Sequence, residues 1–542
     1  MAATMRGGNN VALAIILLCF TCTNNVFLLP SSSASSPTDD FLRCLSGKIP
    51  AEQVFTQSSS GFMAELTSSV QNPRFVTNAT VRPACIVAAS DASHVQAAVR
   101  CGRRSGVRLR VRSGGHDYEG LSYRAVRAET FAVLDLAGLR FVRVRAGDAT
   151  AWVDSGATLG ELYYAVGTAN PGFAFPGGAC STVGVGGYLS GGGIGLMMRK
   201  FGIGADNVLD AMIVNADGEL LDRGRMGEDL FWAIRGGGGE SFGVVVSWRL
   251  KLSMVPPTVA VFTIAKTAGD GGGGGDAAAL LAKWETLILQ PFLPDLTIRV
   301  VLQGRTALFQ CLYLGSGGCA RLAATMRAYF PELGMTASDC HDLTWLRAMA
   351  FISLGAADAP LEGMLRRTNN LGTYVKSKSD YVRRPMGAAV WSALFADHLA
   401  SNNAGVLILE PHGGVVGAVV PDMATPYPHR AGVLYNIQYG VFWWGDAEGE
   451  SSAAARRWLD ALYAAMEAAV SGSPREAFVN YRDLDIGENA VVGGVTEYES
   501  ARRWGERYFM GNFRRLAAVK GRVDPSDFFR NEQSIPPLLQ PY

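Results

Sequence analysis

The sequence predicts an α+β protein made of two parts. In the first part short strands alternate with helices, and the glycines fall in the turns between them. From residue 256 the pattern changes to strands and long helices, which is typical of an antiparallel sheet with helices on one face. A chain of 542 residues is too long for a single core, and 48% hydrophobic and 18% charged residues describe an ordinary globular protein. A formal charge of +1 gives no sign of a nucleic-acid partner.

Residues 1–35 have the pattern of a secretory signal peptide. Arg6 precedes an apolar run that begins at Val11–Leu18, and small residues follow it, so we expect cleavage near Ser33–Ser36. The alternative is a membrane anchor, but polar residues at 21–25 interrupt the run before it reaches the ~20 apolar residues that span a bilayer. We therefore predict a secreted protein without stable membrane insertion, in the extracellular space or cell wall, with the vacuole as an alternative.

Cysteine usage agrees with secretion. Two of the nine cysteines leave with the signal, and the remaining seven are an odd number, so at least one has no partner. Cys44 lies near the start of a helical lead-in at 39–69, and Cys101 lies in a helix that Ser90 or Asp91 caps. We expect these two cysteines to form a disulfide. The sequon at Asn78 predicts a glycosylated surface position.

The remaining elements follow in order. In the first part, strands are expected at 107–111, 131–136, 141–145, 150–154, 208–214 and 243–252. A capping box from Thr158 to Glu161 opens a helix, and another helix is expected at 228–234. Pro256-Pro257 marks a boundary, and 268–275 is a solvated glycine-rich loop. In the second part, strands are expected at 298–303, 307–314, 405–409 and 434–444 and a helix at 452–470, and from 480 a separate unit begins.

Two glycine-rich stretches stand out as a candidate binding site. Arg112–Gly120 places one imidazole, that of His116, directly after a Gly-Gly turn at the end of a strand. Phe175–Gly195 holds nine glycines and a single cysteine, Cys180, and no charged residue occurs from 162 to 198. Consecutive backbone N–H groups in such turns bind anions, and a neutral groove suits a flat ring. The two stretches together therefore indicate a dinucleotide, with His116 and Cys180 approaching one ring.

Other kinds of site fit the sequence less well. Residues 239–243 satisfy the G-x-S-x-G pattern of serine hydrolases, but that motif needs a strand before the serine and a helix after it, and here the order is reversed. A structural turn is the better interpretation. The histidines lack metal-ligand spacing, and the only C-x-x-C lies inside the signal, so no metal site is predicted. The fingerprint of a nicotinamide-type Rossmann domain does not occur near the N-terminus.

Four stretches resemble the plant berberine bridge enzyme-like family. They lie at 112–120, 176–187, 480–487 and 524–535, and the likeness covers nearly the whole mature chain in the right order. The resemblance implies an FAD-binding domain of the vanillyl-alcohol-oxidase (PCMH) type at 36–255. It also implies a substrate-binding domain at 256–477 and a C-terminal berberine-bridge-type segment at 478–542 that completes the FAD domain.

The resemblance further implies that FAD is attached twice, through His116 to the 8α methyl carbon and through Cys180 to ring carbon 6. Cys180 is then an unpaired cysteine of the kind that the odd count requires. Two links prevent loss of the cofactor and raise its potential to accept hydride. The other cofactor-binding residues implied are Arg112, Ser113, Gly114, Gly115, Asp117, Gly177, Gly178, Ser181, Val183, Gly184, Gly187 and Tyr188.

On the substrate side the resemblance points to Tyr481 as the group that takes the substrate's hydroxyl proton. Its alternative role is a packed tyrosine that donates to a backbone carbonyl. Gln438 lies on an expected strand and cannot act as a base, so it positions a hydroxyl or polarises Tyr481. The founding enzyme uses a glutamate for alkaloid ring closure, and the glutamine argues against that reaction. With Tyr118, these residues suit an alcohol on a small phenylpropanoid or a carbohydrate.

Three residues depart from the family pattern: Tyr188 replaces a usual histidine, Ile194 a usual aromatic residue and Phe478 a frequent tyrosine. Val183 lies at a position where a small residue is thought to admit oxygen. The sequence therefore predicts a secreted FAD-linked oxidase that oxidises an alcohol and reduces O2 to hydrogen peroxide. The alternatives are a flavin dehydrogenase with another electron acceptor and a secreted binding protein whose flavin is idle.

Overall fold

The computed structural model describes residues 35–269, 276–290, 293–368, 372–400, 405–418 and 420–539. Nearly all of the predicted signal peptide and most of the predicted glycine-rich loop at 268–275 lie outside these ranges. The chain divides into two compact units, Met1–Ser36 and Pro37–Tyr542. Within the described ranges, no helix has both the length and the apolar character needed to cross a membrane.

The first sheet of the second unit has four strands in the order β1-β2-β4-β3. Their bounds are β1 Val54–Thr56, β2 Cys85–Ala88, β4 Phe131–Asp135 and β3 Arg108–Arg112. The lead-in at 39–69 was expected to be helical. It forms two short helices, α1 (Pro37–Leu45) and α2 (Phe62–Thr67), and the strand β1 lies between them. α3 (Ala92–Ser105) is capped by Asp91, whose carboxylate accepts hydrogen bonds from the backbone N–H groups of Ser93 and His94.

The second sheet has five antiparallel strands in the order β5-β6-β10-β8-β9. These strands are β5 Val142–Arg145, β6 Thr150–Asp154, β10 Val244–Lys251, β8 Val208–Val214 and β9 Leu220–Leu221. The predicted capping box is present at the start of α4 (Leu159–Ala169): Thr158 accepts from the N–H of Glu161, and the Glu161 carboxylate accepts from the N–H of Thr158. α7 (Arg223–Ile234) bends at Gly227, which has a φ of 74°.

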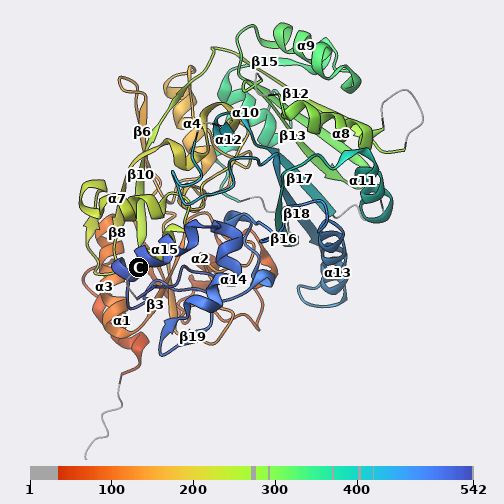
Figure 1. Cartoon of the computed structure of the whole chain (residues 1–542). Helices are drawn as coiled ribbons and strands as arrows, with labels where there is room; N and C mark the ends of the chain where they lie inside the picture. Colours follow the sequence, from red (N-terminus) through yellow and green to blue (C-terminus); the bar gives the residue numbers. More distant parts are fainter. Residues whose placement is uncertain are drawn as a thin grey trace, which may run out of the picture. The chain divides into compact units, whose positions relative to one another are not determined.

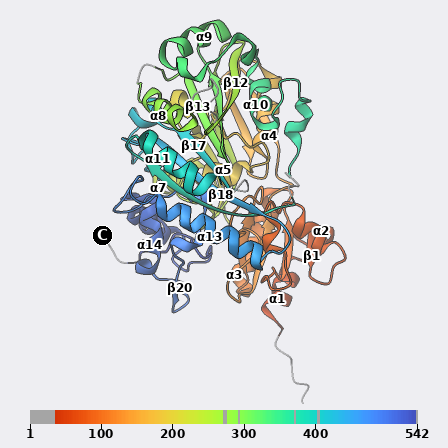
Figure 2. The same ribbon diagram turned by 90° about the vertical axis from the view of Figure 1, so that its right-hand side faces the viewer.

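The third sheet confirms the predicted antiparallel sheet with helices on one face (Figures 1 and 2). Its seven strands have the order β15-β12-β14-β13-β17-β18-β16. Their bounds are β15 His341–Leu343, β12 Val259–Thr267, β14 Thr306–Tyr313, β13 Leu296–Gln303, β17 Gly405–Pro411, β18 Tyr435–Trp443 and β16 Tyr374–Val382. Side chains such as Val300, Leu409 and Ile437 share a core with helices α8 (Ala277–Ile288), α11 (Gly387–Leu394) and α13 (Glu450–Ala465). Side chains alternate between the two faces of a strand, so the residues next to these in each strand face away from the helices.

The C-terminal segment is not the separate unit that its composition suggested. It contains α14 (Tyr498–Phe509) and α15 (Asn512–Val523), and Trp504, Phe513 and Leu516 from these helices lie in the same core as Leu189 and Phe231. These large apolar side chains are removed from water in a shared core, so the segment packs against the first part of the chain.

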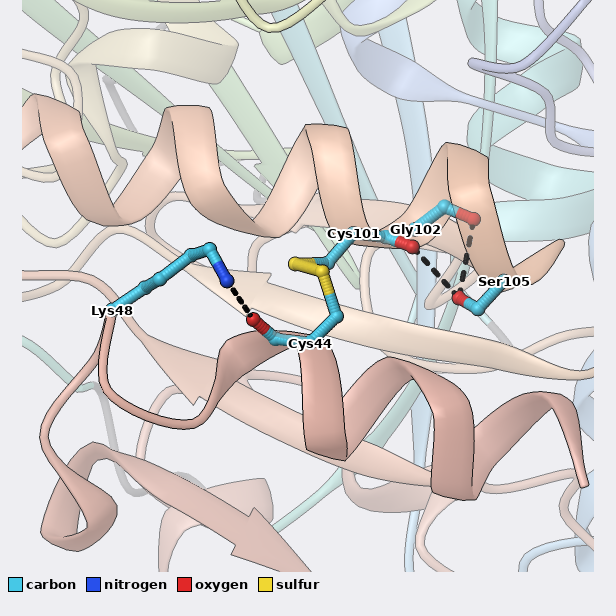
Figure 3. The surroundings of a disulfide bond; sticks show 5 residues. All are labelled: Cys44, Lys48, Cys101, Gly102 and Ser105. Carbon is cyan, nitrogen blue, oxygen red and sulfur yellow. Dashed lines mark hydrogen bonds between the residues drawn. A yellow bond between two sulfur atoms is a disulfide. The ribbon is translucent and has the colours of Figure 1, made fainter. Parts of the chain in front are cut away.

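Two disulfides are present. The predicted bond between Cys44 and Cys101 joins α1 to α3, with an S–S distance of 2.03 Å (Figure 3). A second bond, Cys319–Cys340, was not predicted, and it joins the start of α9 (Gly318–Tyr329) to the residue before β15. Among the described cysteines, three remain free: two are buried and Cys180 is exposed. Asn78 is exposed, as its predicted glycosylation requires.

Candidate active site

The first glycine-rich stretch leaves β3 at Arg112 and turns sharply at Gly115. Gly115 has a φ of 67°, and a Cβ there would lie 1.7 Å from the backbone oxygen of Ser69, so only glycine fits. A Cβ at Gly114 would lie 2.4 Å from the backbone nitrogen of Gly184. The two predicted glycine stretches therefore touch through their backbones. This close approach places His116, which follows the first turn, beside the residues that precede Gly184.

His116 and Cys180 meet at a hydroxyl group. The Nε2 atom of His116 is hydrogen-bonded to the Oγ1 of Thr182 at 2.8 Å, and the sulfur of Cys180 lies 3.3 Å from the same oxygen. Desolvation by the surrounding protein lowers the pKa of His116 to about 4, so its imidazole is neutral near pH 7. The structure thus brings the two residues together, as the sequence required. Thr182 lies inside the stretch 176–187, but no role was predicted for it.

Both side chains line a cavity of about 420 Å³. Its wall also includes most of the predicted cofactor residues: Ser113, Gly114, Gly115, Asp117, Gly178, Val183, Gly184, Gly187 and Tyr188. Gly187 is exposed, and a Cβ built on it would meet no atom within 4 Å, so the backbone there borders open space. Glycine backbone in tight turns suits a pyrophosphate, and a wall with a neutral imidazole beside it suits a flat ring. The residues present therefore fit FAD.

Three residues predicted to contact the cofactor lie behind the wall instead of in it. The guanidinium of Arg112 is fully buried, pairs with Asp135 and donates to two backbone oxygens of α2. Ser181 is hydrogen-bonded to Ser353, and a Cβ on Gly177 would overlap the hydroxyl of Tyr163. For these residues direct contact with a cofactor stays a prediction. Their side chains or close packing hold the glycine stretches in place.

The three departures from the family pattern lie together. The hydroxyl of Tyr188 lies 3.2 Å from the backbone oxygens of Pro176 and Ile194, and it donates to these carbonyls. Ile194 and Phe478 belong to one small buried cluster, and both also line the cavity. Tyr188 thus uses its hydroxyl to hold its own loop, so it does not direct that donor at a ligand.

The predicted substrate residues line the same cavity from the other parts of the chain. Gln438, on β18, donates through Nε2 to the hydroxyl of Tyr118 at 2.7 Å, and the rings of Tyr118 and Tyr481 meet edge to face at 6.2 Å. Burial raises the pKa of Tyr118 to about 12. Burial raises the pKa of Tyr481 well above its ordinary value, and the negative charge of the Glu410 carboxylate adds to this rise. Both phenols are therefore protonated near neutral pH.

Sequence reasoning missed two charged groups of this wall. Arg299 on β13 and Glu410 on β17 line the cavity and lie 2.9 Å apart, from Nε to Oε1. Both occupy strands that hold no other charged residue, and a lone charge in a buried strand is the signal that points to them. Their pairing has no signal in the sequence, because more than a hundred residues separate them.

A cluster of buried charged side chains anchors the segments that carry the site residues. Lys376 on β16 contacts Glu119 at 2.5 Å and Asp483 at 2.7 Å, and these carboxylates follow closely after Tyr118 and Tyr481. Lys378 contacts Asp483 from the next position on the same face of the strand, at 3.2 Å. The cluster therefore ties both tyrosines to the third sheet.

Comparisons with known proteins agree with this geometry. A family model for an FAD binding domain matches residues 83–224, and one for berberine and berberine like proteins matches 477–536. "Berberine bridge enzyme-like Cyn d 4" of Cynodon dactylon is 49% identical over 530 residues, covering 97% of this chain and 99% of that protein. "Monolignol oxidoreductase AtBBE-like 13" of Arabidopsis thaliana is 40% identical over 557 residues, covering 100% of both chains.

The solved structure of wild-type Phl p 4.0202, described as a glucose dehydrogenase, has a TM-score of 0.88 at 48% identity, covering 92% of this chain and 100% of that one. A variant of Phl p 4 with one isoleucine changed to valine, described as a glucose oxidase, has the same TM-score and identity. Relatives of this similarity cover nearly the whole chain, and the solved one shares its fold. The chain therefore belongs to the berberine bridge enzyme-like family of FAD-binding oxidoreductases.

Proposed function

We propose that this chain is a secreted oxidase of an alcohol group that carries its FAD through both His116 and Cys180. The observation that carries this proposal is the meeting of the imidazole and the thiol at the Thr182 hydroxyl, on the wall of one cavity. When bound, the flavin supplies the acceptor for hydride from the alcohol carbon and passes the electrons to O2, which yields hydrogen peroxide.

The residues around the cavity divide by what they do. His116 is neutral, so a ring nitrogen is free to form a bond to carbon, and Cys180 offers an accessible sulfur. Backbone N–H groups at Gly114, Gly115 and Gly184 suit the pyrophosphate. We assign FAD binding to residues 36–255 and 478–542, whose side chains share a core, and substrate binding to 256–477.

The substrate's hydroxyl is oriented by Tyr118, Gln438 and Tyr481. Because the pKa of each phenol is raised, both tyrosines donate hydrogen bonds near neutral pH and neither takes a proton. Gln438 donates to Tyr118 and so fixes the direction of that hydroxyl. This assigns Tyr481 a positioning role in place of the base predicted from the sequence.

The substrate class is a carbohydrate or a small phenylpropanoid alcohol. Relatives described as a glucose dehydrogenase and as a monolignol oxidoreductase support these two classes. The charged pair Arg299–Glu410 in the cavity wall favours the carbohydrate, since a carboxylate and a guanidinium bind several hydroxyls at once.

Val183, which lines the cavity, supports oxygen as the electron acceptor. In Phl p 4 an isoleucine-to-valine change separates a glucose dehydrogenase from a glucose oxidase. A dehydrogenase that uses another acceptor is the second candidate, because wild-type Phl p 4 is described as one. Secretion is supported by two disulfides, which persist in oxidising compartments.

The test uses purified full-length protein without oxygen. Sugars, monolignols and alkaloids are added separately, and the visible absorbance of the flavin is followed. An alcohol that bleaches the colour identifies the substrate, and peroxide on readmission of air identifies an oxidase. Bleaching without peroxide indicates a dehydrogenase. If no compound bleaches the protein, the proposal is wrong and a binding role replaces it.

A further inference from the structure

The pair Arg299–Glu410 is built into neighbouring strands of the third sheet. β13 and β17 are antiparallel, with Val300 opposite Leu409, and Arg299 and Glu410 come one residue further along. Val300 and Leu409 point into the core under the helices, so the charged pair points to the opposite face, where both residues line the cavity. Strand geometry alone thus places a carboxylate among the substrate residues.

The carboxylate of Glu410 lacks a hydrogen-bond partner on one oxygen. Its side chain is 6% exposed; Oε1 faces Arg299, whereas Oε2 is buried and accepts no hydrogen bond from any described residue. A buried carboxylate oxygen without a donor destabilises the protein, so the site favours a ligand that supplies one. The donor has to come from the cavity side, and a substrate hydroxyl is such a donor.

No other group of the wall is as well suited to accept a proton. Gln438 is an amide, and the two tyrosines beside it are protonated phenols. Asp117 and Glu240 also line the cavity, but both pair with Arg482, at 3.4 and 2.7 Å. Among the described carboxylates of the wall, Glu410 is the one with a buried oxygen that accepts no hydrogen bond.

We propose that Glu410 accepts the hydroxyl proton of the alcohol substrate. Its Oε2 first accepts a hydrogen bond from the hydroxyl. As the alcohol is oxidised, the O–H bond breaks and its proton moves to Oε2, the C–H bond gives its electron pair and hydrogen as hydride to the flavin, and the C–O bond becomes a carbonyl. Arg299 holds Oε1 and keeps the carboxylate oriented. This role rests on the proposed function and replaces the base predicted from the sequence.

The charged and titratable groups that face Glu410 come from three parts of the chain. Arg299 lies across the strand pair, Tyr481 belongs to the C-terminal segment and Tyr188 to the second glycine stretch. Burial raises the pKa of Glu410, and Arg299 opposes that rise. Because the base must be ionised, oxidation is expected to slow as pH falls through this raised pKa, above the ordinary glutamate range.

The test compares the wild-type holoenzyme with Glu410→Gln, which keeps the shape of the side chain but cannot take a proton. The rate of anaerobic flavin bleaching by the substrate found above is measured between pH 4 and 9. The expected result is a loss of about 10²- to 10⁴-fold at pH 7 and disappearance of the acid limb. Glu410→Asp, which keeps a carboxylate, is expected to be slower and to retain that limb.

The matched control is Glu285→Gln. Glu285 is also buried, but it lies on α8, accepts from Tyr435 and from two backbone N–H groups, and does not line the cavity. This variant is expected to bleach with the wild-type pH profile. If Glu410→Gln keeps the rate and the acid limb of the wild type, or Glu410→Asp loses the limb, the inference is wrong while the proposed function stands. If no alcohol bleaches the wild type, both are wrong.

Discussion

Replacing Lys376 with methionine tests whether the buried ion cluster holds the site together. Lys376 is 4% exposed, and its ammonium lies 2.5 Å from Glu119, 2.7 Å from Asp483 and 3.2 Å from Asp485. In Lys376→Met the cluster keeps three carboxylates, which are balanced by Lys378 and by Arg124, 3.7 Å from Glu119. Removing one partner from a buried ion pair typically costs about 3–5 kcal/mol. We expect a loss of this size in the free energy of unfolding.

The assay is urea unfolding followed by tryptophan fluorescence, with Lys283→Met as the control. Lys283 contacts Glu332 at 3.2 Å, but their side chains are 44% and 47% exposed, so that pair is worth less than about 1 kcal/mol. The double variant Lys376→Met, Glu119→Gln is expected to recover part of the loss, because it removes one unbalanced charge. Equal losses in the two lysine variants would refute the reasoning.

Three further predictions concern the oxygen gate, the N-terminal disulfide and acid stability. Val183→Leu is expected to slow reoxidation of the reduced protein by O2 and to leave anaerobic bleaching unchanged; equal reoxidation rates in stopped flow would contradict the assignment. Replacing Cys44 and Cys101, which lie 57 residues apart, with serine should lower the free energy of unfolding in urea by about 4 kcal/mol, and no loss would contradict it. Burial raises the pKa of Glu476, but hydrogen bonds from His429 and Arg383 outweigh it and lower the pKa to about 2. This stabilisation, about 3 kcal/mol, is therefore complete above pH 4.5 and lost as pH falls toward 2. Glu476→Gln should accordingly differ from wild type at pH 7 and far less at pH 3; a constant difference would contradict this.

Local patterns predicted much of the fold. β6 at 150–154 and β8 at 208–214 have the expected bounds, and the capping box from Thr158 to Glu161 is present, because each depends on neighbours in sequence. β16 was missed: Lys376 and Lys378 make it look solvent-exposed, and only carboxylates distant in sequence allow its burial. The disulfide Cys319–Cys340 was missed as well, since sequence alone does not define pairings.

The candidate site also has a part that the sequence predicts and a part that it does not. His116 and Cys180 could be predicted because each lies in a long motif, and glycines that tolerate close approach bring the two together. The roles of Arg112, Gly177 and Ser181 could not be separated from those of their neighbours, because adjacent residues of a loop point in different directions. Glu410 and Arg299 meet only through strand pairing, which the sequence does not specify.

The double attachment of FAD is the central proposal, and mass spectrometry of the digested holoenzyme tests it most directly. The protein is denatured in acid, washed free of unbound cofactor and cleaved with trypsin. We predict one flavin that joins the peptide containing His116 to the peptide containing Cys180; His116→Ala should leave the flavin on sulfur alone, and Cys180→Ala on nitrogen alone. Release of the yellow colour into the acid supernatant of the wild type would contradict the account.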